Sequence, residues 1–127
     1  MKIVHLYTGA DGQSHFEDIE LNLRPMGFGM GIELVSEVQG LALRELEPGF
    51  QLGYHTAPRR QIVLQLSGMG ELTCGDGTSR TFGPGDILLA DDLTGQGHIS
   101  REVAGPRRQA FIYLDPNLDL RALRADG

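Results

Sequence analysis

The chain has 127 residues, of which 40% are hydrophobic and 22% charged, with a formal net charge of −6. This length and composition fit one globular domain and exclude a disordered chain. The negative charge argues against a nucleic-acid-binding protein, which needs a basic surface, and no apolar run approaches the ~20 residues of a membrane span.

The hydrophobic pattern predicts an all-β chain whose strands are short and closely spaced. In chain order, strands are predicted over residues 2–7, 19–23, 32–38, 41–46, 50–55, 61–67, 71–74, 80–82, 87–90, 98–103 and 109–114. Residues 24–31 are predicted as a loop or an irregular edge segment, and Gln39–Gly40 and residues 68–70 as turns. Asp115 and Pro116 predict the start of a short helix over 118–124. Such a chain is predicted to form a sandwich or a small barrel.

The stretch from Gly49 to His98 resembles the cupin family in its two sequence motifs. In the first motif Gly49, His55 and Gly68 match the family, whereas Ala57 replaces the second histidine and Gln61 replaces the glutamate. In the second motif Gly85 and Asp86 match, whereas Asp91 replaces the proline, His98 comes two residues late and the final Asn is unmatched. The resemblance covers residues 41–114 and is nearest to small single-domain bacterial cupins. It implies that residues 1–127 form one jelly-roll barrel, also called a double-stranded β-helix.

Strand alternation and this resemblance together predict a pocket. Gln61, Val63 and Gln65 share one strand face, opposite Ile62 and its apolar neighbours. In the implied barrel the inward face would line a pocket, whose predicted polar residues are His55, Gln61, Gln65 and His98. The outward apolar face would need cover, and the family usually supplies it with a second subunit. The resemblance therefore implies a homodimer.

The resemblance also raises a metal site, because metal-binding cupins hold one divalent Fe, Mn, Ni or Zn ion with three His and one Glu. His55, Gln61 and His98 remain as candidate ligands, and Glu45, Asp91 or Asp92 could add a carboxylate. An amide neutralises none of the metal's charge. The preferred interpretation is therefore two barrel histidines that hydrogen-bond to polar neighbours.

Arg59 and Arg60 are predicted at the mouth of the barrel, where they could bind an anion, since arginine pairs bidentately with carboxylate and phosphate. The predicted ligand is thus a small polar or anionic molecule. Solvated arginines, dimer salt bridges, or pairing with Asp91 and Asp92 are the alternatives.

Three functions stay open. The first is a small-molecule-binding cupin, in which His55 or His98 would be a general acid, a general base or a metal ligand if the protein is an enzyme. The second is a metal-free ligand sensor or binding module, and the third is a structural dimer with a vestigial pocket.

The remaining predictions concern single residues and the compartment. Cys74 has no partner for an intrachain disulfide and is predicted to be a buried structural thiol. His5 is predicted on a strand surface, and His15 as a strand start or a residue that supports the site. The N-terminus has no leader pattern, so the cytoplasm is the expected compartment.

Overall fold

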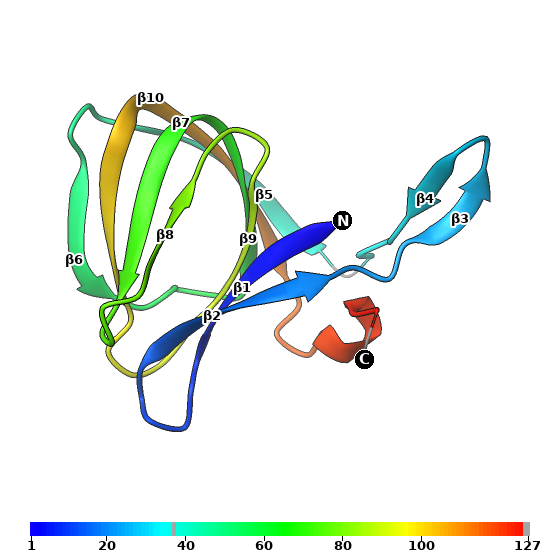
Figure 1. The fold of residues 1–127 in the computed structure, drawn as a ribbon, viewed down its shortest axis with the longest axis horizontal. Helices are drawn as coiled ribbons and strands as arrows, with labels where there is room; N and C mark the ends of the chain where they lie inside the picture. The colour runs from blue at the N-terminus through cyan, green and yellow to red at the C-terminus, as the bar shows by residue number, and fades with distance from the viewer. Residues whose placement is uncertain (37, 126–127) are drawn as a thin grey trace.

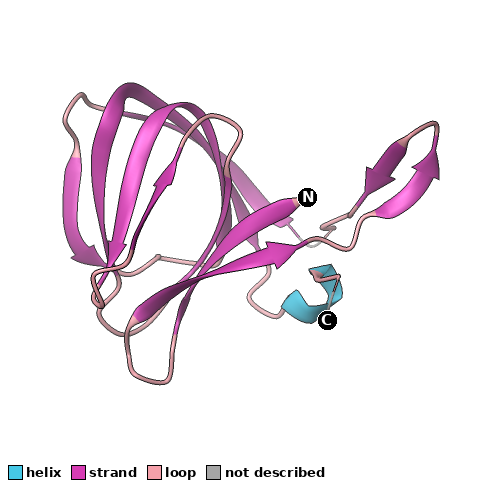
Figure 2. Cartoon of the chain, in the orientation of Figure 1, coloured by secondary structure: helices cyan, strands magenta, loops and turns pink. Residues whose placement is uncertain are grey.

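The computed structural model describes residues 1–36 and 38–125, and nearly all of its elements are strands (Figures 1 and 2). The strands are β1 (Lys2–Thr8), β2 (Ser14–Glu20), β3 (Arg24–Gly27), β4 (Met30–Ile32), β5 (Val38–Leu46), β6 (Gln51–His55), β7 (Gln61–Cys74), β8 (Ser79–Phe82), β9 (Ile87–Asp91) and β10 (His98–Leu114). One 3-10 turn, η1 (Leu120–Leu123), follows them. The predicted all-β class is confirmed. No helix in the described ranges is long and apolar enough to cross a membrane.

Eight strands form one mixed sheet in the order β2-β1-β9-β7-β10-β5, with β8 beside β7 and β6 beside β10. β1 runs parallel to β9, and the other neighbours are antiparallel. The long strands β7 and β10 bend, so the sheet folds into two facing parts (Figure 1). We call these parts the legs of the sheet: one contains β6 and β8, and the other contains β1, β2, β5 and β9. Within the described residues the strand order ends at β2 and at β5, so the sheet does not close into a barrel.

The largest difference from the predicted elements is that β7 and β10 are each one continuous strand. Each was predicted as two strands, separated by a turn at 68–70 and by a break after residue 103. In the structure β7 passes through Gly68 with a positive φ of 72°, and β10 absorbs the bend in register shifts between Glu102 and Gln109. A glycine in the left-handed backbone conformation bends β7, and irregular pairing bends β10, but neither change ends the pairing of the two strands.

The segment before β5 also differs from its prediction. The predicted loop over 24–31 is the hairpin β3–β4, and the strand predicted over 32–38 does not form at residues 33–36, while residue 37 lies outside the described ranges. Gln39 and Gly40 are not a turn but lie inside β5. Gly40 pairs with Tyr113 of β10, and a Cβ there would lie 3.0 Å from its ring, so this glycine serves packing.

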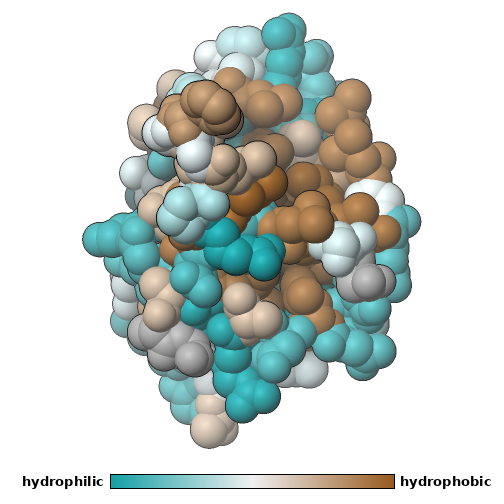
Figure 3. Space-filling model, turned by 90° about the vertical axis from the view of Figure 1, so that its right-hand side faces the viewer, coloured by the Kyte–Doolittle hydropathy of each residue, from teal (hydrophilic) through white to brown (hydrophobic). Residues whose placement is uncertain are grey.

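The hairpin β3–β4 projects from the rest of the chain as an arm (Figure 1). Its apolar side chains are exposed, and Phe28 at its tip is 100% exposed. Leu41 and Leu43 on the edge strand β5 are exposed as well. Figure 3 shows apolar side chains gathered on this side of the molecule.

Two apolar clusters form the core. One lies between the legs and comprises Leu6, Ala57, Val63, Cys74, Phe82, Leu88 and Ala90. The other covers the opposite face of the sheet and comprises Ile3, Ile19, Leu89 and Leu114, with Ile62 packed against it. Part of the apolar face that was expected to need a partner is therefore covered by the chain itself, although Leu66 stays 53% exposed.

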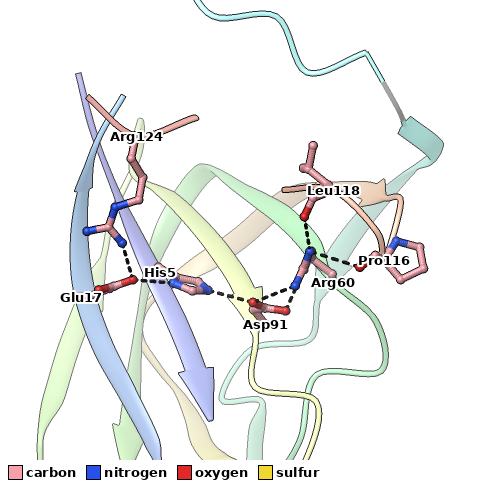
Figure 4. Close-up of polar contacts among 7 residues, drawn as sticks. All are labelled: His5, Glu17, Arg60, Asp91, Pro116, Leu118 and Arg124. Atoms are coloured by element: carbon pink, nitrogen blue, oxygen red, sulfur yellow. Dashed lines mark hydrogen bonds and ion pairs between the residues drawn. The ribbon is translucent and has the colours of Figure 1, made fainter. Parts of the chain in front are cut away.

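A chain of ion pairs joins the N-terminal hairpin to the C-terminal segment (Figure 4). His5 places Nδ1 2.8 Å from Glu17 Oε1 and Nε2 2.9 Å from Asp91 Oδ2. Arg124 pairs with Glu17 at 2.9 Å, and Arg60 pairs with Asp91 at 2.9 Å. The prediction of a surface His5 is wrong, because the residue is only 7% exposed.

The C-terminal helix that was predicted over 118–124 is reduced to η1. Its N-cap is Asp119, whose side chain accepts a hydrogen bond from the Arg121 backbone, rather than Asp115. Asp115 instead accepts from the Asn117 N–H at 2.8 Å and stabilises the preceding turn.

Candidate functional site

A cavity of about 570 Å³ lies between the two legs of the sheet. This volume falls within the roughly 300–1,000 Å³ of typical small-molecule sites. Most of its wall is apolar, and its polar lining consists of Arg44, His55, Thr56, Arg59, Gln61, Gln65, Asp86, His98, Ser100, Arg107, Gln109 and Tyr113. The fold thus brings the four predicted pocket residues and Arg59 around one cavity.

The two histidines are cross-strand neighbours on β6 and β10. Their ring centroids lie 4.4 Å apart with the planes tilted by 55°. His55 Nδ1 lies 2.7 Å from the Gly53 carbonyl, which can only accept, so this nitrogen carries the hydrogen and Nε2 keeps its lone pair. Burial lowers the pKa of His55, and the nearby His98 lowers it further, although the bond to Gly53 opposes this shift. His55 is therefore neutral at pH 7.

Asp92 orients His98 from outside the cavity. Its Oδ2 lies 2.6 Å from His98 Nδ1 and also accepts from Ser14 Oγ at 2.7 Å, and the residue has no exposed surface. With Nδ1 directed at a carboxylate, Nε2 of His98 is the nitrogen left for a ligand. Asp92 is a candidate metal carboxylate from the sequence, but its side chain contacts His98 Nδ1 and does not line the cavity. Ser14 was not identified from sequence, since no spacing links it to the motifs.

Gly97 allows the two histidines to meet. It has a positive φ of 77°, and a Cβ there would overlap the backbone carbonyl of His55. Only glycine permits this loop to approach β6 so closely. The glycine immediately before His98 is thus part of the geometry of the site.

The two glutamines of β7 have different surroundings, although each is 4% exposed. Gln65 is fully engaged, because its Nε2 donates to the Ser67 carbonyl at 2.8 Å and its Oε1 accepts from Gln109 at 2.9 Å. Gln61 Oε1 is buried and has no hydrogen-bond partner among the described residues. It is one of five buried side-chain polar atoms without a partner among the described residues, and its burial places it out of reach of a molecule in the cavity.

The structure separates Arg59 from Arg60. Arg59 lines the cavity, with its guanidinium 4.2 Å from the centroid of Tyr113. Arg60 pairs with Asp91 and donates to the Leu118 carbonyl at 2.8 Å, away from the cavity (Figure 4). The two consecutive arginines therefore do not form one anion site, and the considered pairing with Asp91 holds for Arg60.

A divalent metal fits the donors around the cavity poorly. His55, His98 and Gln61 would offer only neutral atoms, and Ala57 offers none. Within the described ranges, no group of three or more His, Cys, Asp or Glu side chains is placed to hold a metal ion. Structural and catalytic metal sites normally combine at least three such ligands.

Cys74 and His15 lie outside this site. Cys74 has no exposed surface, and burial raises the pKa of its thiol to about 11, so the predicted buried thiol is confirmed. His15 is the second residue of β2 and lies 2.9 Å from Asp11 and 3.7 Å from Asp76. Neither residue lines the cavity.

Comparisons with known proteins supply no further assignment, since no family model matches the chain and no curated protein matches it.

Proposed function

We propose that the protein is a cupin-like binding protein that takes a small polar or anionic molecule with an apolar body into the cavity between the legs of its sheet. The observation that carries this proposal is a cavity of about 570 Å³ whose largely apolar wall holds the side chains of His55, His98 and Arg59. The Nε2 atoms of His55 and His98 supply two acceptors. A ligand with an O–H or N–H group would satisfy this set.

Stability of two matched variants tests the role of Gln61. Gln61→Met removes the unpaired oxygen at similar volume, so we expect the free energy of unfolding to rise by about 1–2 kcal/mol. Gln65→Met breaks satisfied hydrogen bonds on the same face, so we expect a loss of about 1–2 kcal/mol. Urea denaturation measures both. If Gln61→Met destabilises as much as Gln65→Met, Gln61 makes a stabilising contact and its oxygen is not unsatisfied.

The Asp92–His98 contact favours acid–base chemistry as a second candidate function. A carboxylate at Nδ1 holds the imidazole in one tautomer and stabilises the cation that forms when Nε2 takes a proton from a bound molecule. His98 would be the general base in such a reaction, and Asp92 the positioning residue. If the bound molecule carries no acidic proton, the protein binds it without acid–base chemistry.

Metal dependence is a separate prediction. Protein purified without a histidine tag and reconstituted with iron, manganese, nickel or zinc can be assayed for metal content. Stoichiometric metal that disappears in His98→Ala would support the metal-assisted version. Substoichiometric metal with all four ions would rule it out and leave the metal-free binding protein.

We also propose a homodimer in which the arm of one copy packs on the edge strand β5 of another. Phe28 on the arm and Leu43 on β5, which are 100% and 77% exposed, give one chain both halves of a self-complementary apolar contact. Edge strands with exposed apolar side chains are suited to pairing with a second chain.

Sedimentation velocity at micromolar concentration tests this contact. We expect wild type to sediment as a dimer and Phe28→Asp as a monomer. Leu93→Asp, at another exposed apolar position (40% exposed), should leave the dimer intact. A monomeric wild type, or a dimer that persists in Phe28→Asp, would contradict the proposed interface.

A further inference from the structure

Two arginines at the cavity are stacked on aromatic rings of its wall. The guanidinium carbon of Arg44 lies 4.3 Å from the centroid of Phe111, and that of Arg59 lies 4.2 Å from the centroid of Tyr113. All four residues line the cavity. Stacking covers one face of a guanidinium but leaves its N–H groups, which lie in the plane, free to donate.

These two arginines differ from most others in the chain because neither has a carboxylate partner. Among the residues that the structure describes, the arginines with a carboxylate oxygen within 4.0 Å are Arg60, Arg80, Arg101, Arg107, Arg108, Arg121 and Arg124. Arg24 on the arm is the remaining one without. Arg59 also donates no hydrogen bond to another described residue, so all of its N–H groups are available.

The two stacked arginines lie at the same face of β10. Phe111 and Tyr113 are two residues apart on this strand, so their side chains share one face, and both line the cavity. An oxyanion bound at this wall of the cavity would face both guanidinium groups.

Arg44 is held in place by the glutamine network of the cavity wall. Its Nε and Nη2 donate to Gln109 Oε1 at 3.2 and 2.9 Å, and Gln109 in turn donates to Gln65 at 2.9 Å. Gln65 ends the chain on the Ser67 carbonyl. Both amides therefore have fixed orientations, and Arg44 Nη1 remains free for a ligand.

The charges around the cavity favour an anion, although the chain as a whole is acidic. Three arginines, Arg44, Arg59 and Arg107, line it against one acidic residue, Asp86. Burial lowers the pKa of Arg44, and the charge of Arg107 lowers it further. A bound anion would relieve this repulsion.

From this geometry we propose that the ligand carries a carboxylate that Arg44 and Arg59 bind together, with its apolar body directed into the cavity. The inference rests on the proposed function and adds the chemical class of the ligand. It also replaces the consecutive arginines of the sequence prediction with a pair from β5 and the β6–β7 loop.

A matched pair of probes tests the inference: 4-phenylbutyrate and its neutral amide, 4-phenylbutyramide, which share one apolar body. Titrations followed by NMR of the ¹⁵N-labelled full chain give both dissociation constants. We expect the carboxylate to bind about tenfold or more tightly than the amide, since hydrogen bonds to charged groups are stronger than those to neutral groups. The preference should fall as salt is raised.

Three variants identify the residues responsible. Arg59→Gln and Arg44→Gln should each weaken carboxylate binding by about tenfold and leave amide binding within about twofold. Arg24→Gln removes the same charge far from the cavity lining and should leave the preference unchanged. Neither Arg44 nor Arg59 belongs to the buried core, so these variants are expected to fold.

The outcomes separate the two proposals. Equal binding of carboxylate and amide, or a preference that survives in Arg44→Gln and Arg59→Gln, would overturn the inference and leave the binding pocket standing. Failure of both probes to shift any resonance of cavity residues would overturn the inference together with the proposed pocket.

Discussion

Gly68→Ala is expected to lower the free energy of unfolding by about 3 kcal/mol or more, which is a large part of the stability of a domain of this size. Gly68 has a positive φ of 72°, and a Cβ would lie 2.6 Å from the Pro106 carbonyl oxygen and 2.7 Å from that of Ala104. Backbone atoms of β10 cannot move aside without disturbing the bend that both long strands share. Strain from φ and steric overlap therefore add.

Gly77→Ala is the matched control for this prediction. Gly77 also has a positive φ, 87°, but a Cβ there would meet nothing within 4 Å. We expect it to cost only the left-handed penalty of about 1–2 kcal/mol. Urea denaturation followed by circular dichroism compares the two variants. Equal losses would mean that the close approach of β7 and β10 at Gly68 does not contribute.

The same position explains where sequence reasoning on the fold succeeded and where it failed. Period-two alternation and glycine content were enough to predict the all-β class and most strands, because strands such as β7 alternate between buried and more exposed residues. Gly68 and Gly70 were interpreted as a turn, because glycines between apolar runs normally end strands. Whether the backbone reverses or only bends depends on the β10 residues that pair with β7, and these are distant in sequence.

The candidate site, like the fold, could be predicted only in part. Strand alternation and the resemblance to the cupin motifs together pointed to His55, Gln61, Gln65 and His98, all of which lie around one cavity. The partners of these residues could not be predicted, because Asp92 reaches His98 only through the loop that Gly97 allows. Nor does the sequence indicate that consecutive arginines at 59 and 60 point to different sides of the sheet, since no strand periodicity applies in that loop.

His5→Gln is expected to remove a pH dependence of stability that wild type shows as pH rises above about 6.5. Burial alone would lower the pKa of His5, but its hydrogen bonds and charge interactions with Asp91 and Glu17 outweigh burial and raise it above the ordinary value of 6.5. With each ring nitrogen facing a carboxylate, the imidazole is best satisfied as a cation that donates from both.

The sign of the effect follows from linkage. The folded protein holds the His5 proton more tightly than the unfolded chain, so this stabilisation is complete below about pH 6.5 and is lost as pH rises through the raised folded value. Asp91 has the opposite shift. Its pKa is lowered because hydrogen bonds from His5 and Arg60 outweigh burial, so its contribution is lost as pH falls through that lowered value.

The measurement compares the free energy of unfolding of wild type and His5→Gln between about pH 5 and 9. The difference should be largest at the acidic end, about 2 kcal/mol, and should shrink as pH rises. Comparison of the two proteins cancels His55, whose lowered pKa acts in the opposite direction. An NMR titration of the His5 ring should give a midpoint above 6.5.

His15→Gln provides the control, because its contact with Asp11 is more exposed and such pairs contribute only about 0–1 kcal/mol. If His15→Gln reproduced the effect of His5→Gln, the pH dependence would be a property of general charge and not of the buried network. A His5 midpoint at or below 6.5 would show that burial outweighs the two carboxylates. In that case the link that His5 makes between the N-terminal hairpin, β9 and the C-terminal segment would be neutral, and would stabilise the fold more at high pH than at low pH.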